Sequence, residues 1–94
     1  MRESDIEAKM RNMIKQHGGL FLKFISPSTR GVPDRIVIKK PGRVIFVELK
    51  REGEKPTPLQ RHIHKQLRSF GLEVYVVIGM QEVIKFVEEV FPNE

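Results

Sequence analysis

The most informative segment of this chain is Arg43-Val-Ile-Phe-Val-Glu-Leu-Lys50. Four consecutive apolar residues at positions 44–47 predict a β-strand that is buried on both faces. Because side chains alternate across a strand, Glu48 and Lys50 should point to one face and Leu49 to the other. A carboxylate and an ammonium at the end of an apolar strand are costly to leave unpaired. The segment therefore predicts a central strand with a charged end.

The residues before this segment predict its partner strand. A strand is expected over residues 34–39, and Pro41-Gly42 is a turn signal between the two strands. In an antiparallel hairpin centred on position 41, Asp34 and Glu48 lie at the same end, because they flank the turn symmetrically. This placement depends on the hairpin forming in that register. Two carboxylates are enough protein ligation for Mg²⁺, which also takes waters and phosphate oxygens. The hairpin thus predicts a metal site beside Lys50.

The rest of the chain predicts an α/β domain. Apolar stripes at helical spacing indicate helices over residues 5–17, 58–70 and 80–91. Further strands are expected over residues 20–25 and 73–78. The order α-β-β-β-α-β-α predicts a central mixed sheet flanked by helices, and the length of 94 residues fits a single domain, 1–94.

Composition points to a polyanionic partner. Seventeen Lys and Arg residues against twelve Asp and Glu residues give a formal net charge of +5 and a pI near 9.8. Such an excess attracts nucleic acid. The absence of cysteine excludes disulfides and thiol catalysis and favours a reducing, cytoplasmic location. The longest apolar run, residues 74–78, is too short for a membrane span, and no secretory signal is expected.

At this point the sequence resembles a known family. Gly31-Val32-Pro33-Asp34-Arg35, followed by Glu48-Leu49-Lys50 and Gln60, is similar to the motif set of a stand-alone VRR-NUC domain of the phage and bacterial type. These domains belong to the PD-(D/E)xK nucleases, with a restriction-endonuclease-like fold similar to that of Holliday-junction resolvases. The resemblance extends over almost the whole chain, from Glu7 to the last strand.

The resemblance implies a Mg²⁺- or Mn²⁺-dependent DNA endonuclease in a bacterial cell or a phage-infected host. The implied metal ligands are Glu7, Asp34, Glu48 and the backbone carbonyl of Leu49. Lys50 would be the catalytic lysine, and Gln60 would position water or phosphate. A four-way DNA junction is the expected substrate, and a homodimer would let two strands be cut symmetrically.

Several of these residues also have a structural interpretation. Ser4-Asp5-Ile6-Glu7 and Thr57-Pro58-Leu59-Gln60 both match a capping box, in which the fourth side chain caps the start of a helix. For Glu7 the capping role is the stronger one without the resemblance, and the metal role is the stronger one with it. Asp34 could cap a turn after Pro33. The three histidines (His17, His62 and His64) are expected on the surface.

DNA contacts are expected from basic and hydroxyl side chains around the site. The candidates are Ser26, Ser28, Arg30, Arg35, Arg51 and Arg61. Other basic residues (Lys39, Lys40, Arg43, Lys55, Lys65 and Arg68) are individually expected to be ordinary surface residues. The alternative functions are a flap or end-processing nuclease with the same site, a non-catalytic DNA-binding module, and a partner-binding domain with an incidental basic surface.

Overall fold

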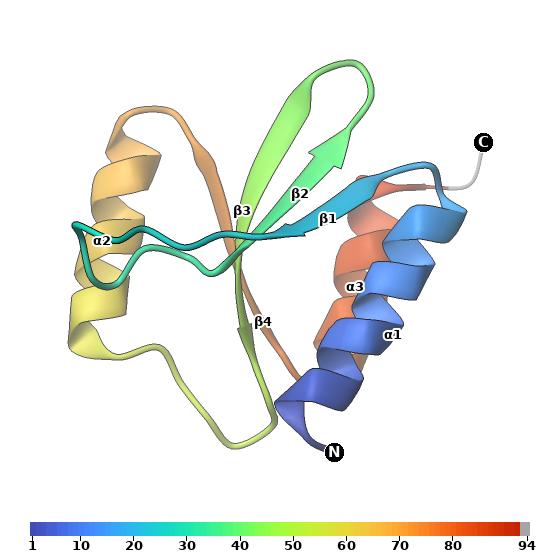
Figure 1. Ribbon diagram of the computed structural model, residues 1–94, viewed down its shortest axis with the longest axis horizontal. Coiled ribbons are helices and arrows are strands. Elements are labelled where there is room, and N and C mark those ends of the chain that lie inside the picture. The colour runs from blue at the N-terminus through green and yellow to red at the C-terminus, as the bar shows by residue number, and fades with distance from the viewer. Residues whose placement is uncertain (93–94) are drawn as a thin grey trace.

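The computed structural model describes residues 1–92, which contain three helices and four strands. The helices are α1 (Glu3–Gln16), α2 (Pro58–Ser69) and α3 (Gly79–Val90). The strands are β1 (Leu20–Lys23), β2 (Arg35–Lys39), β3 (Arg43–Lys50) and β4 (Glu73–Ile78). Figure 1 shows the sheet between α2 on one side and the pair α1 and α3 on the other. The predicted order and fold class are confirmed. Residues 93–94 of the predicted domain lie outside the described part.

The four strands form one mixed sheet in the order β1-β2-β3-β4. β1 and β2 are antiparallel, β2 and β3 are antiparallel, and β3 and β4 are parallel. The β2–β3 ladder pairs Arg35 with Val47 and Lys39 with Arg43, so the hairpin is centred on position 41 as predicted. Asp34 immediately precedes β2 and therefore lies opposite Glu48.

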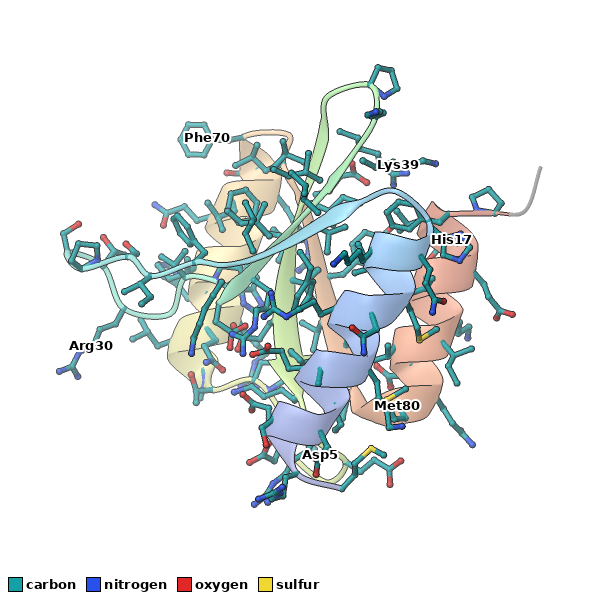
Figure 2. All side chains as sticks on the ribbon, turned by 45° about the vertical axis from the view of Figure 1, so that its right-hand side comes forward. Asp5, His17, Arg30, Lys39, Phe70 and Met80 are labelled. Atoms are coloured by element: carbon teal, nitrogen blue, oxygen red, sulfur yellow. The ribbon has the colours of Figure 1, made fainter. Side chains whose placement is uncertain are left out.

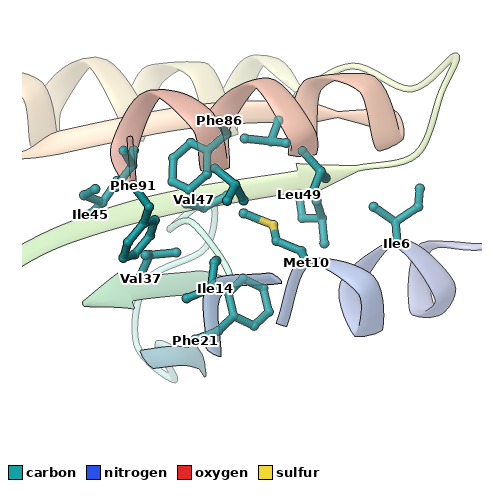
Figure 3. Packing of buried hydrophobic residues seen from close by; sticks show 14 residues of the cluster. Ile6, Met10, Ile14, Phe21, Val37, Ile45, Val47, Leu49, Phe86 and Phe91 are labelled. Carbon is teal, nitrogen blue, oxygen red and sulfur yellow. The ribbon is translucent and has the colours of Figure 1, made fainter. Parts of the chain in front are cut away.

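The main core lies between the sheet and the two helices α1 and α3. Ile45, Val47 and Leu49 of β3 point to this side, as their alternation requires, and all three are buried. They pack with Met10 of α1 and Phe86 of α3 (Figure 3). Burial of such apolar side chains contributes about 1.5–3 kcal/mol each. This packing fixes the position of β3 in the domain, and therefore also the position of the side chains on its opposite face.

The opposite face of the sheet is only partly covered by α2. Phe46, Glu48 and Lys50 alternate with the core residues of β3 and so lie on this side. The apolar spacing in this helix predicts one buried stripe of Leu59, Ile63, Leu67 and Phe70, and this is only partly right. Ile63 and Leu67 are half-buried, whereas Leu59 is 47% exposed and Phe70, after the end of the helix, is 79% exposed. The α2 side chains that reach Glu48 on β3 are the polar Gln60 and His64.

Two predicted element boundaries were also wrong. α1 begins at Glu3 with Arg2 as its N-cap, and no side chain caps it, so the capping box that starts at Ser4 does not form. β1 ends at Lys23 rather than at Ile25, although the Phe24 N–H still donates to the Asp34 carbonyl. That bond ties the loop after β1 to the start of β2. No helix in residues 1–92 has the length and apolar character needed to cross a membrane.

Candidate active site

The charged end of β3 brings three of the predicted site residues together. The Lys50 ammonium Nζ lies 3.7 Å from Glu48 Oε2, as expected for side chains two residues apart on one strand face. The Asp34 carboxylate is next to them across the hairpin, and its Oδ1 accepts a long hydrogen bond of 3.4 Å from the Leu49 N–H. Asp34, Glu48 and Lys50 therefore form one cluster, at the end of the sheet away from the Pro41 turn.

Glu48 is the most deeply buried carboxylate of this cluster, with an exposed fraction of only 2%. Burial, helped by the nearby negative charge of Asp34 and opposed by Lys50, raises the pKa of Glu48 to about 7. One oxygen, Oε1, has no hydrogen-bond partner among the described residues. A carboxylate in this environment gains strongly from a neighbouring positive charge.

Gln60, at the start of α2, forms the predicted capping box and also lies beside the cluster. Thr57 caps the helix, its Oγ1 accepting from the Gln60 N–H, while the Gln60 Oε1 accepts from the Thr57 N–H at 2.8 Å. The other end of the same amide, Nε2, donates to Glu48 Oε2 at 3.4 Å. The capping box thus orients the amide so that its donor faces the cluster.

His64 belongs to this site, and sequence reasoning placed it wrongly on the surface. Its exposed fraction is 1%, and its Nε2 lies 3.5 Å from Glu48 Oε1. Burial lowers the pKa of His64, and the positive charges of Arg68 and Lys50 lower it further, which favours the neutral imidazole. The signal in the sequence was its spacing of four residues from Gln60, which puts both side chains on one helix face. His17 and His62 are exposed, as predicted.

Glu7 reaches the cluster only through an arginine. Its carboxylate binds Arg11 and also Arg35, whose Nη2 lies 2.7 Å from Glu7 Oε2. Arg35 continues to Asp34, with 3.0 Å between Nη1 and Oδ2. Arg11 and Arg35 hold the pKa of Glu7 below its ordinary value. The structure therefore gives Glu7 a link to Asp34 rather than a place beside Glu48.

Comparison with known proteins gives the family. No family model matches the sequence. The chain is 46% identical over 77 residues to the protein described as "Putative nuclease p44" from Acyrthosiphon pisum secondary endosymbiont phage 1, a match that covers 82% of this chain and 83% of that protein. The structure of this chain superposes on a solved structure described as a VRR_NUC domain with a TM-score of 0.84 at 33% identity, and the match covers 92% of this chain and 94% of the other. The chain belongs to the VRR-NUC family.

In this VRR-NUC domain the residues present fit a hard divalent cation. No group of three His, Cys, Asp or Glu side chains within residues 1–92 is arranged to hold a metal ion. Two carboxylates are nevertheless sufficient for Mg²⁺. Asp34 and Glu48 are mutually repulsive, and Glu48 has a buried oxygen without a hydrogen-bond partner. A cation between them would offset both penalties.

The expected DNA contacts of the domain fall into two groups. Ser28 and Arg30 are exposed on the loop between β1 and β2, and Figure 2 shows Arg30 pointing outward from it. Arg51 and Arg61 are also exposed, with Arg51 pairing with Glu54 and Arg61 donating to the Pro56 carbonyl. Ser26, on the same loop as Arg30, is half-buried.

Arg35 stands apart from the other expected DNA contacts. Its side chain is 4% exposed and is held between Glu7 and Asp34. A buried guanidinium bound to two carboxylates does not present its donors to a phosphate at the surface. The structure therefore places Arg35 in the interior, where its donors do not face a DNA phosphate.

Proposed function

We propose that this VRR-NUC domain, residues 1–94, is a metal-dependent endonuclease that hydrolyses DNA phosphodiester bonds with Mg²⁺ or Mn²⁺. One observation carries the proposal: the buried Glu48 carboxylate lies beside Asp34 and Lys50 at the polar end of an otherwise apolar strand. Such a buried charged group destabilises the fold, so its presence in a cluster indicates a functional role. Two carboxylates with a lysine can hold a cation and act on water in phosphodiester hydrolysis. The phage relative described as a nuclease supports the same conclusion.

Each residue of the cluster has a distinct role in this proposal. Asp34, Glu48 and the carbonyl of Leu49 would hold the cation, which would supply charge neutralisation at the phosphate and a lower pKa for a bound water. The Lys50 side chain is 17% exposed, so it remains accessible to a water or a phosphate oxygen. It donates a hydrogen bond that orients the water or stabilises the developing negative charge. Gln60 holds one oxygen of Glu48 in place.

The DNA backbone is expected to lie across the loop between β1 and β2 and the start of α2. Arg30 and Arg61 project from these two segments, and both are exposed. The two segments are in contact at Gly31, because a Cβ at this position would lie 3.0–3.1 Å from atoms of Leu59 and Ile63. The loop therefore packs directly on α2. Arg30, Arg61, Ser28 and Arg51 would contact phosphates without reading sequence.

We infer further that the substrate is branched DNA and that the enzyme is a homodimer. A four-way junction has two strands to cut, and a two-fold dimer presents two sites related in the same way. The part of the α2-side sheet face that α2 leaves uncovered supports this, because it carries exposed apolar side chains. These are Leu20 and Leu22 of β1 and Val44 of β3. Such a patch on a small domain favours association with a second copy.

The main alternative is a DNA-binding module without catalysis. The two carboxylates argue against it, because Asp34 and Glu48 would repel a phosphate unless a cation lay between them. A flap or end-processing nuclease with the same site differs only in the DNA it cuts.

The proposed endonuclease would act on DNA in the bacterial cytoplasm, in the cell itself or in a phage-infected host.

A single cleavage assay tests the proposal. The purified protein is incubated with four-way, flapped and linear DNA in Mg²⁺, Mn²⁺ or EDTA. We expect metal-dependent cleavage, greatest on the four-way junction, and loss of at least about 100-fold in Asp34→Asn and Lys50→Met. Lys85→Met, exposed on α3 across the sheet, is the matched control and should cut normally. Cleavage in EDTA, or full activity in Lys50→Met, would contradict the mechanism.

A further inference from the structure

The second buried group of the site, His64, has no role in the function proposed so far. It lies on α2 one turn after Gln60, is 1% exposed, and its Nε2 has no hydrogen-bond partner among the described residues. Leaving a buried ring nitrogen unpaired costs about 1–3 kcal/mol. A leucine at this position would avoid that cost, so the imidazole needs a specific explanation.

The position of the Glu48 carboxylate beside that nitrogen explains why an imidazole is present. Nε2 of His64 lies 3.5 Å from Oε1 of Glu48, and this oxygen is itself buried without another partner. Gln60 approaches the other oxygen, Oε2, at 3.4 Å. Two donors from consecutive turns of α2 therefore face the two oxygens of one carboxylate. Both distances are long for a hydrogen bond, and a shift of a few tenths of an ångström would bring each into the usual range.

The orientation of the Gln60 amide is fixed independently of Glu48. Its Oε1 accepts from the Thr57 N–H in the capping box, so Nε2 is the atom that faces the carboxylate. For His64, the position of Glu48 Oε1 beside Nε2 selects the neutral tautomer that carries its proton on Nε2. His64 is not arranged as a ligand with the two carboxylates, because no group of three His, Cys, Asp or Glu side chains within residues 1–92 is placed to hold a metal ion.

We propose that His64 is a positioning residue that donates a hydrogen bond from Nε2 to Glu48 Oε1 and, with Gln60, fixes the carboxylate for cation binding. This inference rests on the proposed function, because it assigns Glu48 to the cation. It predicts that His64 contributes to catalysis without touching the DNA phosphate or the metal. Outer partners of this kind typically change metal affinity or activity by about 10- to 100-fold when removed.

The first experiment needs no variant. Two-dimensional NMR of the ¹⁵N-labelled imidazoles in metal-free protein at pH 8 reports which ring nitrogen carries the proton. We expect His64 as the Nε2–H tautomer, with a downfield proton that indicates a hydrogen bond to a carboxylate. A proton on Nδ1 would overturn the proposal, since Nε2 could then donate nothing to Glu48.

The second experiment compares two substitutions at the same position. His64→Gln keeps a donor near the place of Nε2, whereas His64→Met keeps the volume and removes the donor. Titration calorimetry with Mn²⁺ in the absence of DNA should show affinity about tenfold or more weaker in His64→Met, and much less affected in His64→Gln. Cleavage should show a fall in kcat with an unchanged KM for DNA. His62→Met, two residues away and exposed, is the control.

The outcomes separate this inference from the function itself. If wild type binds Mn²⁺ and cuts DNA while folded His64→Met does so equally well, the positioning role is wrong and the nuclease stands. If wild type neither binds Mn²⁺ nor cuts DNA, the proposed function fails, and the inference fails with it. If His64→Met does not fold, two other measurements decide: the His64 tautomer in wild type and the Mn²⁺ affinity of His64→Gln. A wild-type proton on Nδ1 together with a weakened Mn²⁺ affinity in His64→Gln overturns the proposal.

Discussion

Asp34 and Glu48 face each other at the open end of the β2–β3 hairpin, one pair beyond the Arg35–Val47 pair. Asp34 is half-buried and Glu48 fully buried, so the two negative charges interact with little water between them. A shift of one residue in the hairpin would turn Glu48 and Lys50 into the core and destroy the cluster. The buried Ile45, Val47 and Leu49 prevent that shift, so the core specifies the site.

The burial of Glu48 should make the metal-free protein less stable as the pH rises. Its folded pKa, about 7, lies above the ordinary value of 4.5, so the folded state holds its proton more tightly than the unfolded state. The stabilising effect of that proton is complete below pH 4.5 and is lost between pH 4.5 and 7. We expect a loss of roughly 3 kcal/mol across this window, measured by urea unfolding in EDTA.

Glu48→Gln provides the comparison for that measurement. The amide does not titrate, so the fall in the free energy of unfolding between pH 4.5 and 7 should be absent in this variant. Added Mg²⁺ should restore stability to wild type at pH 8 and leave Glu48→Gln nearly unchanged. Parallel pH profiles for the two proteins would mean that the carboxylate is not perturbed as inferred.

The two roles of Gln60 should separate by mutation. Thr57→Ala removes the side-chain cap but keeps the backbone N–H that orients the Gln60 amide, so it should cost about 1 kcal/mol of stability with little change in kcat. Gln60→Ala should cost a similar amount of stability and also lower kcat, because Glu48 loses a donor. Thermal unfolding and single-turnover cleavage measure the two effects. Equal kcat values in both variants would assign Gln60 to the cap alone.

Local patterns in the sequence were enough to predict the fold and the core of the cluster. The apolar run and the alternation in β3, the Pro41-Gly42 turn and the Thr57 cap each act within a few residues, and all four features are confirmed. Alternation within one strand and symmetry about one turn placed Asp34, Glu48 and Lys50 together. No contact between distant elements was needed for this.

Contacts between distant elements account for the errors. Ser4-Asp5-Ile6-Glu7 has the pattern of a capping box, yet Glu7 binds Arg35, 28 residues away, and the helix starts earlier. His64 is buried because α2 turns it and Gln60 towards Glu48 and leaves Leu59 about half exposed. Apolar periodicity alone missed this polar contact, since it did not take into account that the sheet is polar at that point.

The Glu7–Arg35 pair should contribute to stability with the opposite pH dependence to Glu48. Arg11 and Arg35 lower the pKa of Glu7, so its contribution is present above pH 4.5 and is lost as the pH falls through the lowered folded value. Glu7→Gln should cost about 2 kcal/mol at pH 7, because Arg35 is buried and loses one of its two partners. Asp5→Asn, which breaks an exposed pair with Arg2, should cost far less. Equal costs at pH 7 would contradict the buried role.

The dimer proposal predicts a different outcome for two leucine-sized residues of similar exposure. Leu22 on β1 is 45% exposed on the part of the α2-side face that α2 leaves uncovered, and Ile84 on α3 is 43% exposed on the other side of the sheet. Sedimentation equilibrium at micromolar concentration should give twice the 11.0 kDa chain mass for wild type and Ile84→Glu. In Leu22→Glu the dimer should weaken at least about tenfold, because a carboxylate would be buried unpaired in the interface. That variant should still nick a junction, but without coupled cuts on two strands. A monomeric wild type would refute the dimer and remove the reason for expecting symmetric junction cleavage.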